Sequence, residues 1–147
     1  MGATILGPGE GESLTVGATV TVLKATGGTT GGGYALGEAT LAPGFAGPPA
    51  HLHREHHDAF YVLEGTLTLR VGDELREEGP GAFVCIPPGV VHTFSNGSDH
   101  PVRFLNVSSP AGMEDYLREL SKTIADGAPD PQRMADVMVK YDVVLVD

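Results

Sequence analysis

Several kinds of residue are scarce in this 147-residue sequence, and each shortage excludes a class of protein. The chain has one cysteine, Cys85, so it forms no internal disulfide and suits a reducing compartment. It has no apolar run of the length that a membrane span requires, and no basic residue precedes Lys24. We therefore expect a cytoplasmic protein with neither a transmembrane helix nor a signal peptide.

Basic residues are also few, since nine Lys and Arg stand against 19 Asp and Glu and give a net charge of −10. The nine are scattered between Lys24 and Lys140 without forming a cluster. A nucleic-acid surface requires a basic stripe, and docking on anionic lipid requires basic groups as well. We expect a small-molecule substrate and a second copy of the chain as partners, and neither nucleic acid nor membrane.

The 21 glycines and 11 prolines separate short apolar segments instead of forming one biased tract. Several segments alternate with period two, as in residues 66–71, which suits a strand with one buried face. Gly72 and Asp73 then fit a tight hairpin turn. Many short strands at regular spacing indicate a sandwich or a barrel. The predicted strands are residues 14–25, 33–42, 50–54, 58–63, 66–71, 73–77, 82–86, 90–95 and 101–108.

The last quarter of the chain has a different pattern, with apolar residues at helical spacing over residues 113–124. Gly127 is placed to end this helix. A second helix begins with Asp130 as N-cap and Pro131 in its first turn, and residues 143–146 form a last short strand. The two helices either cover one outer face of the barrel or place their methionines at the mouth of a pocket.

Two features that suggest chemistry at first sight have plainer interpretations. The glycine-rich residues 26–33 lack the Lys-Ser/Thr pair of a phosphate-binding loop, so we interpret them as a hairpin connection. Cys85 lies in the apolar sequence Phe83-Val84-Cys85-Ile86, which predicts a buried and inert thiol because an activated thiolate needs electropositive surroundings.

Histidine is concentrated, because five of the six histidines are at positions 51, 53, 56, 57 and 92. Side chains two apart in an extended strand share a face, so His51 and His53 point the same way. Imidazoles that close suit one divalent metal ion. A turn after them brings the Asp58 carboxylate back toward the two imidazoles, and His92 begins a strand after a rigid Pro-Pro-Gly turn.

Two motifs built on these residues resemble the motifs of cupins. The first motif is matched by His51, His53, Asp58 at the usual glutamate position, and Gly65. The second motif is matched by Gly81, Pro87, Gly89, His92 and Asn96. The chain departs from the first motif at its opening glycine, since only three residues separate Gly47 from His51. The resemblance covers roughly residues 15–140 and is greatest to single-domain cupins similar to quercetin dioxygenases.

The resemblance implies an all-β fold, the double-stranded β-helix or jelly-roll barrel, over about residues 14–108. Two α-helices over about residues 110–141 follow it, and residues 1–147 form a single cupin domain. It also implies one divalent metal ion, which is iron, manganese, nickel, cobalt, copper or zinc. The ligands carried over from the family are His51, His53, Asp58 and His92.

The identity of the fourth ligand stays open at the level of sequence. Asp58 is one methylene shorter than the glutamate of the family, so the backbone shifts, a water bridges, or His57 turns inward instead. Neighbours in a strand face opposite sides, so Asp58 and His57 do not both point inward without a bulge.

The resemblance implies a dioxygenase that acts on an aromatic or enol/hydroxyketone substrate, polyketide- or flavonoid-like, with Asp58 as catalytic base. Period two places Phe60 and Val62 inward with Asp58, and Phe94 inward with His92, as the wall of a substrate pocket or as ordinary core. The alternatives are a non-redox isomerase or cyclase of secondary metabolism, with or without metal, and a small-molecule-binding cupin without turnover. A free strand edge near the amino terminus predicts a homodimer.

Overall fold

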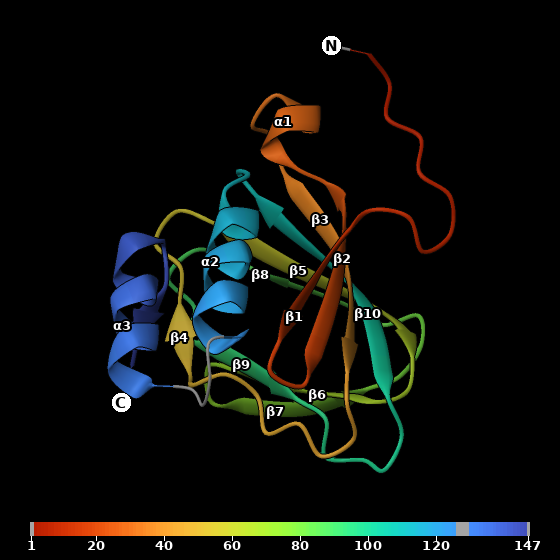
Figure 1. Cartoon of the computed structure of the whole chain (residues 1–147). Helices are drawn as coiled ribbons and strands as arrows, with labels where there is room; N and C mark the ends of the chain where they lie inside the picture. The colour runs from red at the N-terminus through yellow and green to blue at the C-terminus, as the bar shows by residue number, and fades with distance from the viewer. Residues whose placement is uncertain (1, 126–129, 147) are drawn as a thin grey trace.

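The computed structural model describes residues 2–125 and 130–146, and Figure 1 shows a body of strands with the two carboxyl-terminal helices on one side. The strands of the first half are β1 Glu12–Val16, β2 Thr19–Ala25, β3 Ala35–Leu41, β4 His51–Leu52, β5 His57–Glu64 and β6 Leu67–Val71. The later strands are β7 Glu74–Glu78, β8 Phe83–Ile86, β9 His92–Ser95, β10 Val102–Ser109 and β11 Val144–Leu145. The helices are α1 Gly27–Thr30, α2 Met113–Ala125 and α3 Pro131–Lys140.

The strands form two antiparallel sheets that face one another (Figure 1). One sheet has the order β1-β2-β3-β10-β5-β8, and the other has the order β11-β4-β9-β6-β7. Strands distant in the sequence are therefore neighbours, so that β10 lies between β3 and β5, and β9 lies between β4 and β6. The prediction of an all-β architecture with helices at the carboxyl end is confirmed.

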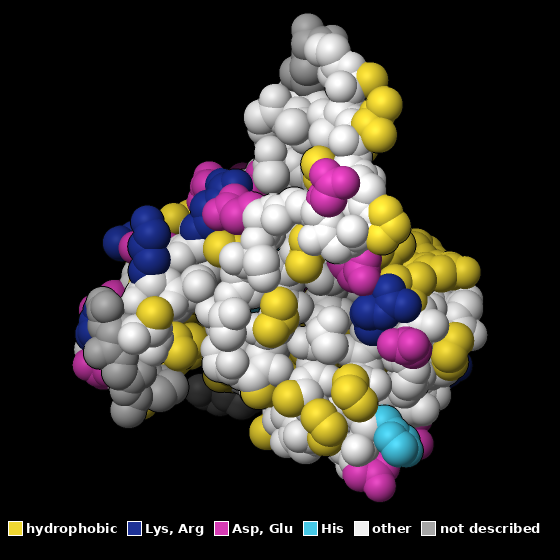
Figure 2. Space-filling view, turned by 45° about the vertical axis from the view of Figure 1, so that its right-hand side comes forward, with side chains coloured by type: hydrophobic (Ala, Val, Ile, Leu, Met, Phe, Trp, Pro, Cys, Tyr) yellow, Lys and Arg dark blue, Asp and Glu magenta, His cyan; other side chains and the backbone are white. Residues whose placement is uncertain are grey.

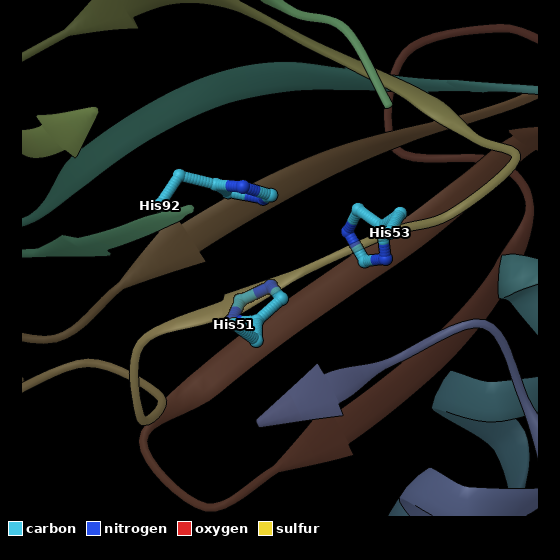
Figure 3. A group of neighbouring side chains, drawn as sticks. All are labelled: His51, His53 and His92. Atoms are coloured by element: carbon cyan, nitrogen blue, oxygen red, sulfur yellow. The ribbon is translucent and has the colours of Figure 1, made fainter. Parts of the chain in front are cut away.

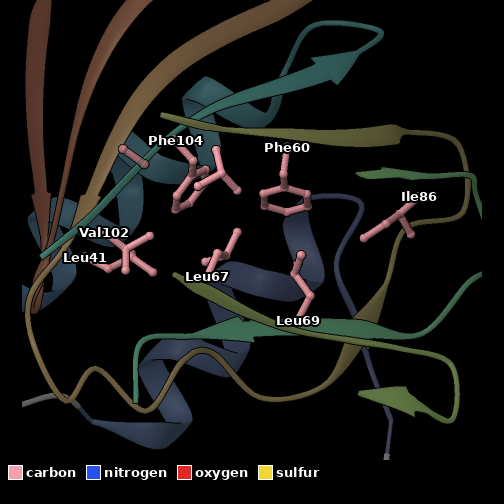
Figure 4. Packing of buried hydrophobic residues seen from close by; sticks show 9 residues of the cluster. Leu41, Phe60, Leu67, Leu69, Ile86, Val102 and Phe104 are labelled. Atoms are coloured by element: carbon pink, nitrogen blue, oxygen red, sulfur yellow. The ribbon is translucent and has the colours of Figure 1, made fainter. Parts of the chain in front are cut away.

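The core lies between the sheets and is built from alternate residues of the central strands (Figure 4). Phe60 and Phe104 come from one sheet, with ring centroids 5.5 Å apart, and Leu67 and Leu69 meet them from the other. Each such buried side chain contributes roughly 1.5–3 kcal/mol relative to exposure. The buried members are Ala39, Leu41, Phe60, Val62, Leu67, Leu69, Ile86, Val102 and Phe104.

The amino-terminal region differs from the single strand predicted over residues 14–25. The structure divides it into β1 and β2, which form a hairpin with Val16 opposite Thr19. Gly17 has a φ of 59° in the turn, a conformation that glycine adopts without strain. Alternation alone did not reveal this turn because both halves alternate in the same way. The glycine-rich connection that follows contains the one-turn helix α1 and joins β2 to β3.

The two carboxyl-terminal helices agree with the prediction. Asp130 caps α3 by accepting a hydrogen bond from the amide of Gln132 at 2.9 Å. The buried Glu114 anchors the start of α2, because its carboxylate accepts hydrogen bonds from the amides of Gly112 and Gly27, the latter at 2.6 Å. Gly127, predicted to end the first helix, lies outside the described residues.

The prediction for Cys85 is wrong, since its side chain is exposed. Strand β8 lies at the edge of the six-stranded sheet and alternates, with Ile86 buried while Cys85 and Phe83 face outward. The apolar run misled the interpretation because only one face of an edge strand packs on the core.

Basic groups on the face drawn in Figure 2 lie next to acidic ones. Arg118 contacts Glu12 at 2.7 Å, and Arg103 contacts Glu38 at 2.7 Å. Among the residues that the structure describes, no helix is long and apolar enough to cross a membrane.

Replacement of Asn96 by Ala tests the packing of the loop that follows β9. The Asn96 side chain is fully buried, donates to the carbonyls of Ala42 and His100, and accepts from Ser98. Its loss removes these hydrogen bonds and the packing of a buried side chain, so we expect the free energy of unfolding to fall by about 3 kcal/mol. Chemical denaturation of Asn96→Ala measures this fall. The matched control is His100→Ala, whose side chain is 81% exposed. Equal stability of the two variants would contradict the role assigned to Asn96.

Candidate metal centre

Three buried histidines meet where β4 and β9 pair (Figure 3). His51 lies opposite His92 in the ladder, and their ring centroids are 4.5 Å apart. His53 follows two residues after His51, and its ring centroid is 5.1 Å from each of the other two. One ring nitrogen from each residue lies within 4.8 Å of the others, so the three side chains are placed to bind one metal ion.

The segment before β4 is held against β9 by two close contacts. Gly47 has a φ of 91°, and a Cβ there would lie 2.1 Å from the carbonyl oxygen of Phe94, so no other residue fits. The Thr93 hydroxyl donates to the carbonyl of Pro48 at 2.7 Å. These contacts fix the register that brings His51 opposite His92.

All three imidazoles are oriented in the same way, with Nδ1 against a backbone carbonyl. The contacts are His51 to Pro49 at 2.8 Å, His92 to Val90 at 3.0 Å and His53 to Asp142 at 2.5 Å. A carbonyl oxygen only accepts, so Nδ1 carries the proton in each ring. In the neutral form Nε2 then has a free lone pair, which is the arrangement of histidines that bind a metal.

Asp58 lies beside the cluster, with its carboxylate divided between two sets of contacts. Its Oδ1 accepts a hydrogen bond from the Asn106 amide at 2.6 Å. Its Oδ2 lies 3.3 Å from Nε2 of His92 and 3.5 Å from Nε2 of His53. The carboxylate thus points at two of the three histidines and away from solvent, since Asp58 is 7% exposed.

This geometry requires a positive charge between the groups. Nε2 of each neutral histidine is an acceptor, and so is the Asp58 carboxylate, so at these distances the lone pairs would face one another without compensation. Either a proton on an imidazole or a metal cation relieves that repulsion. Three imidazoles and one carboxylate suit first-row divalent ions, so the residues present fit a metal.

The pKa shifts in the cluster favour a proton on His53 over one on His51. Burial disfavours the charged form of His53, but its hydrogen bonds to Asp58 and to the Asp142 carbonyl outweigh burial and raise its pKa. Burial also acts against the charge of Asp58, yet hydrogen bonds from His53, His92 and Asn106 hold its pKa at about 2. Burial lowers the pKa of His51 to about 4, with the other two imidazoles acting in the same direction. The cluster therefore contains an ionised carboxylate and at least one neutral imidazole at neutral pH.

The alternative fourth ligand, His57, is exposed at the start of β5, where it lies opposite Ser109. The two side chains that the sequence left open as the fourth ligand thus differ in burial, because Asp58 points inward and His57 points outward. His56 belongs to the connecting loop, and its Nδ1 lies 2.7 Å from the carboxylate of Asp142.

The predicted pocket residues lie in the core or against it. Phe60 and Val62 are 1% exposed within the core, and Phe94 packs against it. A cavity of about 30 Å³ lies elsewhere among the described residues, under α2, and Asn106 and Met113 are among the residues lining it. Asn106 therefore contacts Asp58 and also lines this cavity, although the volume falls far short of the several hundred Å³ of a typical ligand site.

Sequence reasoning missed two residues that hold the site. Asn106 lies two positions after Phe104 on the inward face of β10, so a polar residue at an expected core position was an available signal. Asp142 gave no such signal, because its contact with His53 joins residues 89 apart in the sequence and depends on the tertiary fold.

Comparison with known proteins agrees with the fold. The family model described as the cupin domain matches residues 37–108, which include all three histidines and Asp58. The three clustered histidines thus lie within the segment that matches the cupin domain. The chain as a whole resembles quercetin-dioxygenase-like cupins.

Three relatives span different activities. Quercetin 2,3-dioxygenase of Bacillus subtilis is 28% identical over 154 residues, a match that covers 97% of this chain and 44% of the relative, so the chain spans less than half of that protein. The polyketide cyclase RemF of Streptomyces resistomycificus is 26% identical with a TM-score of 0.65, over 73% of this chain and 79% of that one. A sugar phosphate isomerase of the cupin superfamily from Silicibacter pomeroyi is 26% identical with a TM-score of 0.56, over 64% and 60% of the two chains.

The low pKa of His51 predicts a pH-dependent stability of the metal-free protein. Between about pH 6.5 and about pH 4 the unfolded chain protonates this residue while the folded protein does not, so stability falls as the pH falls through that window. The raised pKa of His53 affects stability at pH values above this window, where the folded protein keeps a proton that the unfolded chain releases. Thermal unfolding of the chelator-treated protein measures the trend. We expect His51→Gln to flatten it and the exposed control His100→Gln to leave it unchanged. An equal slope in both variants would contradict the assignment.

Proposed function

We propose that the chain is a metal-dependent cupin enzyme in which His51, His53 and His92 bind one divalent metal ion. This proposal rests on a group of acceptor atoms that face one another. Oδ2 of Asp58 lies 3.3 Å from Nε2 of His92 and 3.5 Å from Nε2 of His53. A divalent cation among them would satisfy the carboxylate and all three imidazoles at once. Asp58 is proposed as a direct ligand or as the neighbouring base.

We further propose that the reaction is a dioxygenation of an aromatic or enol/hydroxyketone substrate. The similarity to quercetin 2,3-dioxygenase over 97% of this chain supports this choice. A bound metal would supply a Lewis acid that polarises a substrate oxygen. In the protein itself, Asn106 holds one carboxylate oxygen of Asp58 and leaves Oδ2 to accept the proton of a substrate hydroxyl.

The substrate is proposed to enter between the sheets, beside the histidines. Phe60, Val62 and Phe94 would form the apolar wall near the metal, and the cavity beneath α2 would become continuous with this space when side chains of that helix move. Met113 lines the cavity and has a pliable side chain suited to such movement.

A cyclase or isomerase without redox chemistry is the second candidate, and the similarity to RemF favours it. The same Asp58 would then transfer a proton without consumption of oxygen. A binding protein without turnover is the third, although an oriented carboxylate beside three histidines favours catalysis.

We also propose a cytoplasmic homodimer, in which β1, an edge strand in this structure, pairs with a second copy.

Elemental analysis tests the metal site. We expect the purified wild-type protein to hold one divalent metal ion per chain, and we expect His51→Ala and His92→Ala to lose it because each removes one of three ligands. His100→Ala, at an exposed position, is the matched control and should retain the metal. Equal metal content in all four proteins would exclude the site.

Oxygen consumption with quercetin as a probe distinguishes the two enzymatic candidates. A dioxygenase should consume oxygen with the flavonol, and Asp58→Asn should slow the reaction by at least ~100-fold because the proton acceptor is lost. Asp73→Asn, in the exposed β6–β7 turn, should react like the wild type. Conversion without oxygen or in chelator would contradict the dioxygenase and favour the cyclase. Binding of quercetin without any product would favour the binding protein.

A further inference from the structure

The carboxyl-terminal segment of the chain is built into the metal centre. Strand β4, which begins with His51, is two residues long and pairs with β9 through the single pair His51–His92. On its other side β11 pairs with it, so that Leu145 lies opposite His51, and the amide of Val146 donates to the carbonyl of Ala50. Figure 3 shows this last strand running next to the histidines. A strand this short depends on neighbours on both sides.

Asp142 makes contacts with both its backbone and its side chain in this region. Its carbonyl accepts the Nδ1 proton of His53 and so holds that ring with Nε2 toward the cluster. Its carboxylate binds the loop that follows His53, through the amides of Arg54 at 2.7 Å, Glu55 at 2.8 Å and His56 at 3.1 Å. The Nδ1 of His56 adds a fourth donor at 2.7 Å.

The strength of this attachment follows from its charge. Four donors converge on one carboxylate, and hydrogen bonds to an ionised acceptor are roughly twice as strong as those between neutral groups. The loop from Arg54 to His56 leads from His53 toward Asp58, so this carboxylate holds the connection between the two residues.

His56 shows that the attachment is not optimised for stability alone. Its Nδ1 is bonded to Asp142, while its Nε2 is buried without a hydrogen-bond partner among the described residues. A buried polar atom without a partner costs about 1–3 kcal/mol. This nitrogen belongs to a side chain close to the cluster, since the ring centroids of His56 and His53 are 6.4 Å apart.

From these contacts we infer that Asp142 is a positioning residue for the metal centre. This inference rests on the proposed function, because it concerns metal binding by His51, His53 and His92. Asp142 fixes the His53 ring through its carbonyl and fixes the path from His53 to Asp58 through its carboxylate. Groups that orient metal-binding histidines commonly change metal affinity by 10–100-fold when they are replaced. Coupling is reciprocal, so metal binding also stabilises the carboxyl-terminal segment.

The direct test is Asp142→Asn with Co²⁺ as the probe ion. The amide has the same shape, but its NH₂ group faces the backbone donors of the loop, so the loop shifts. We expect the Kd for Co²⁺ to rise about tenfold. We also expect the visible absorption spectrum of bound Co²⁺ to change, which a loss of stability alone does not cause. The matched control is Asp136→Asn on the exposed face of α3, which should keep the wild-type Kd and spectrum.

Hydrogen exchange in the wild-type protein provides a second measurement that does not require the variant to fold. Co²⁺ should slow exchange at the amides of residues 54–56 and 144–146. Unchanged exchange there, or equal Kd values and spectra for Asp142→Asn and Asp136→Asn, would overturn the role of Asp142 while leaving the metal site intact. Absence of Co²⁺ binding by the wild type would overturn both the metal site and this inference.

Discussion

Asp58 and two of the three clustered histidines present acceptor atoms to one another at 3.3 and 3.5 Å in a buried site. The backbone imposes this arrangement, because each Nδ1 donates to a carbonyl and each Nε2 is therefore directed inward. Such a group is stable only with a cation among its members. The raised pKa of His53 favours a proton on this ring, and a divalent ion would fulfil the requirement for all four side chains.

The rest of the fold holds these atoms at the edge of a well-packed core. Phe60 and Phe104 fill the space between the sheets and fix β5 and β10, and these strands bring Asp58 and Asn106 together. The strand that carries His51 contributes little order of its own, since it is two residues long. Its position is set by Gly47 on one side and by the carboxyl-terminal segment on the other. The site thus depends on parts of the chain that are far apart in sequence.

Much of this was predictable from the sequence, and the exceptions have physical reasons. Period-two alternation and the His-x-His spacing predict the strands and the shared face of His51 and His53, because both follow from local geometry. The inward position of Asp58 was one of two open alternatives, and in the structure it is Asp58 that is buried. Local patterns did not reveal the turn at Gly17, because the alternation continues through it, or the exposure of Cys85, which depends on which strand lies at a sheet edge. The role of Asp142 required the tertiary fold.

The central claim is that Nε2 of His51, His53 and His92 bind one cation together. A crystal structure of the Co²⁺-loaded protein, with anomalous diffraction at the cobalt edge, tests this claim most directly. The account predicts a single anomalous peak about 2.1 Å from each of the three Nε2 atoms, with Asp58 next to it. A peak located elsewhere, or histidine rings turned so that Nδ1 faces the ion, would contradict it.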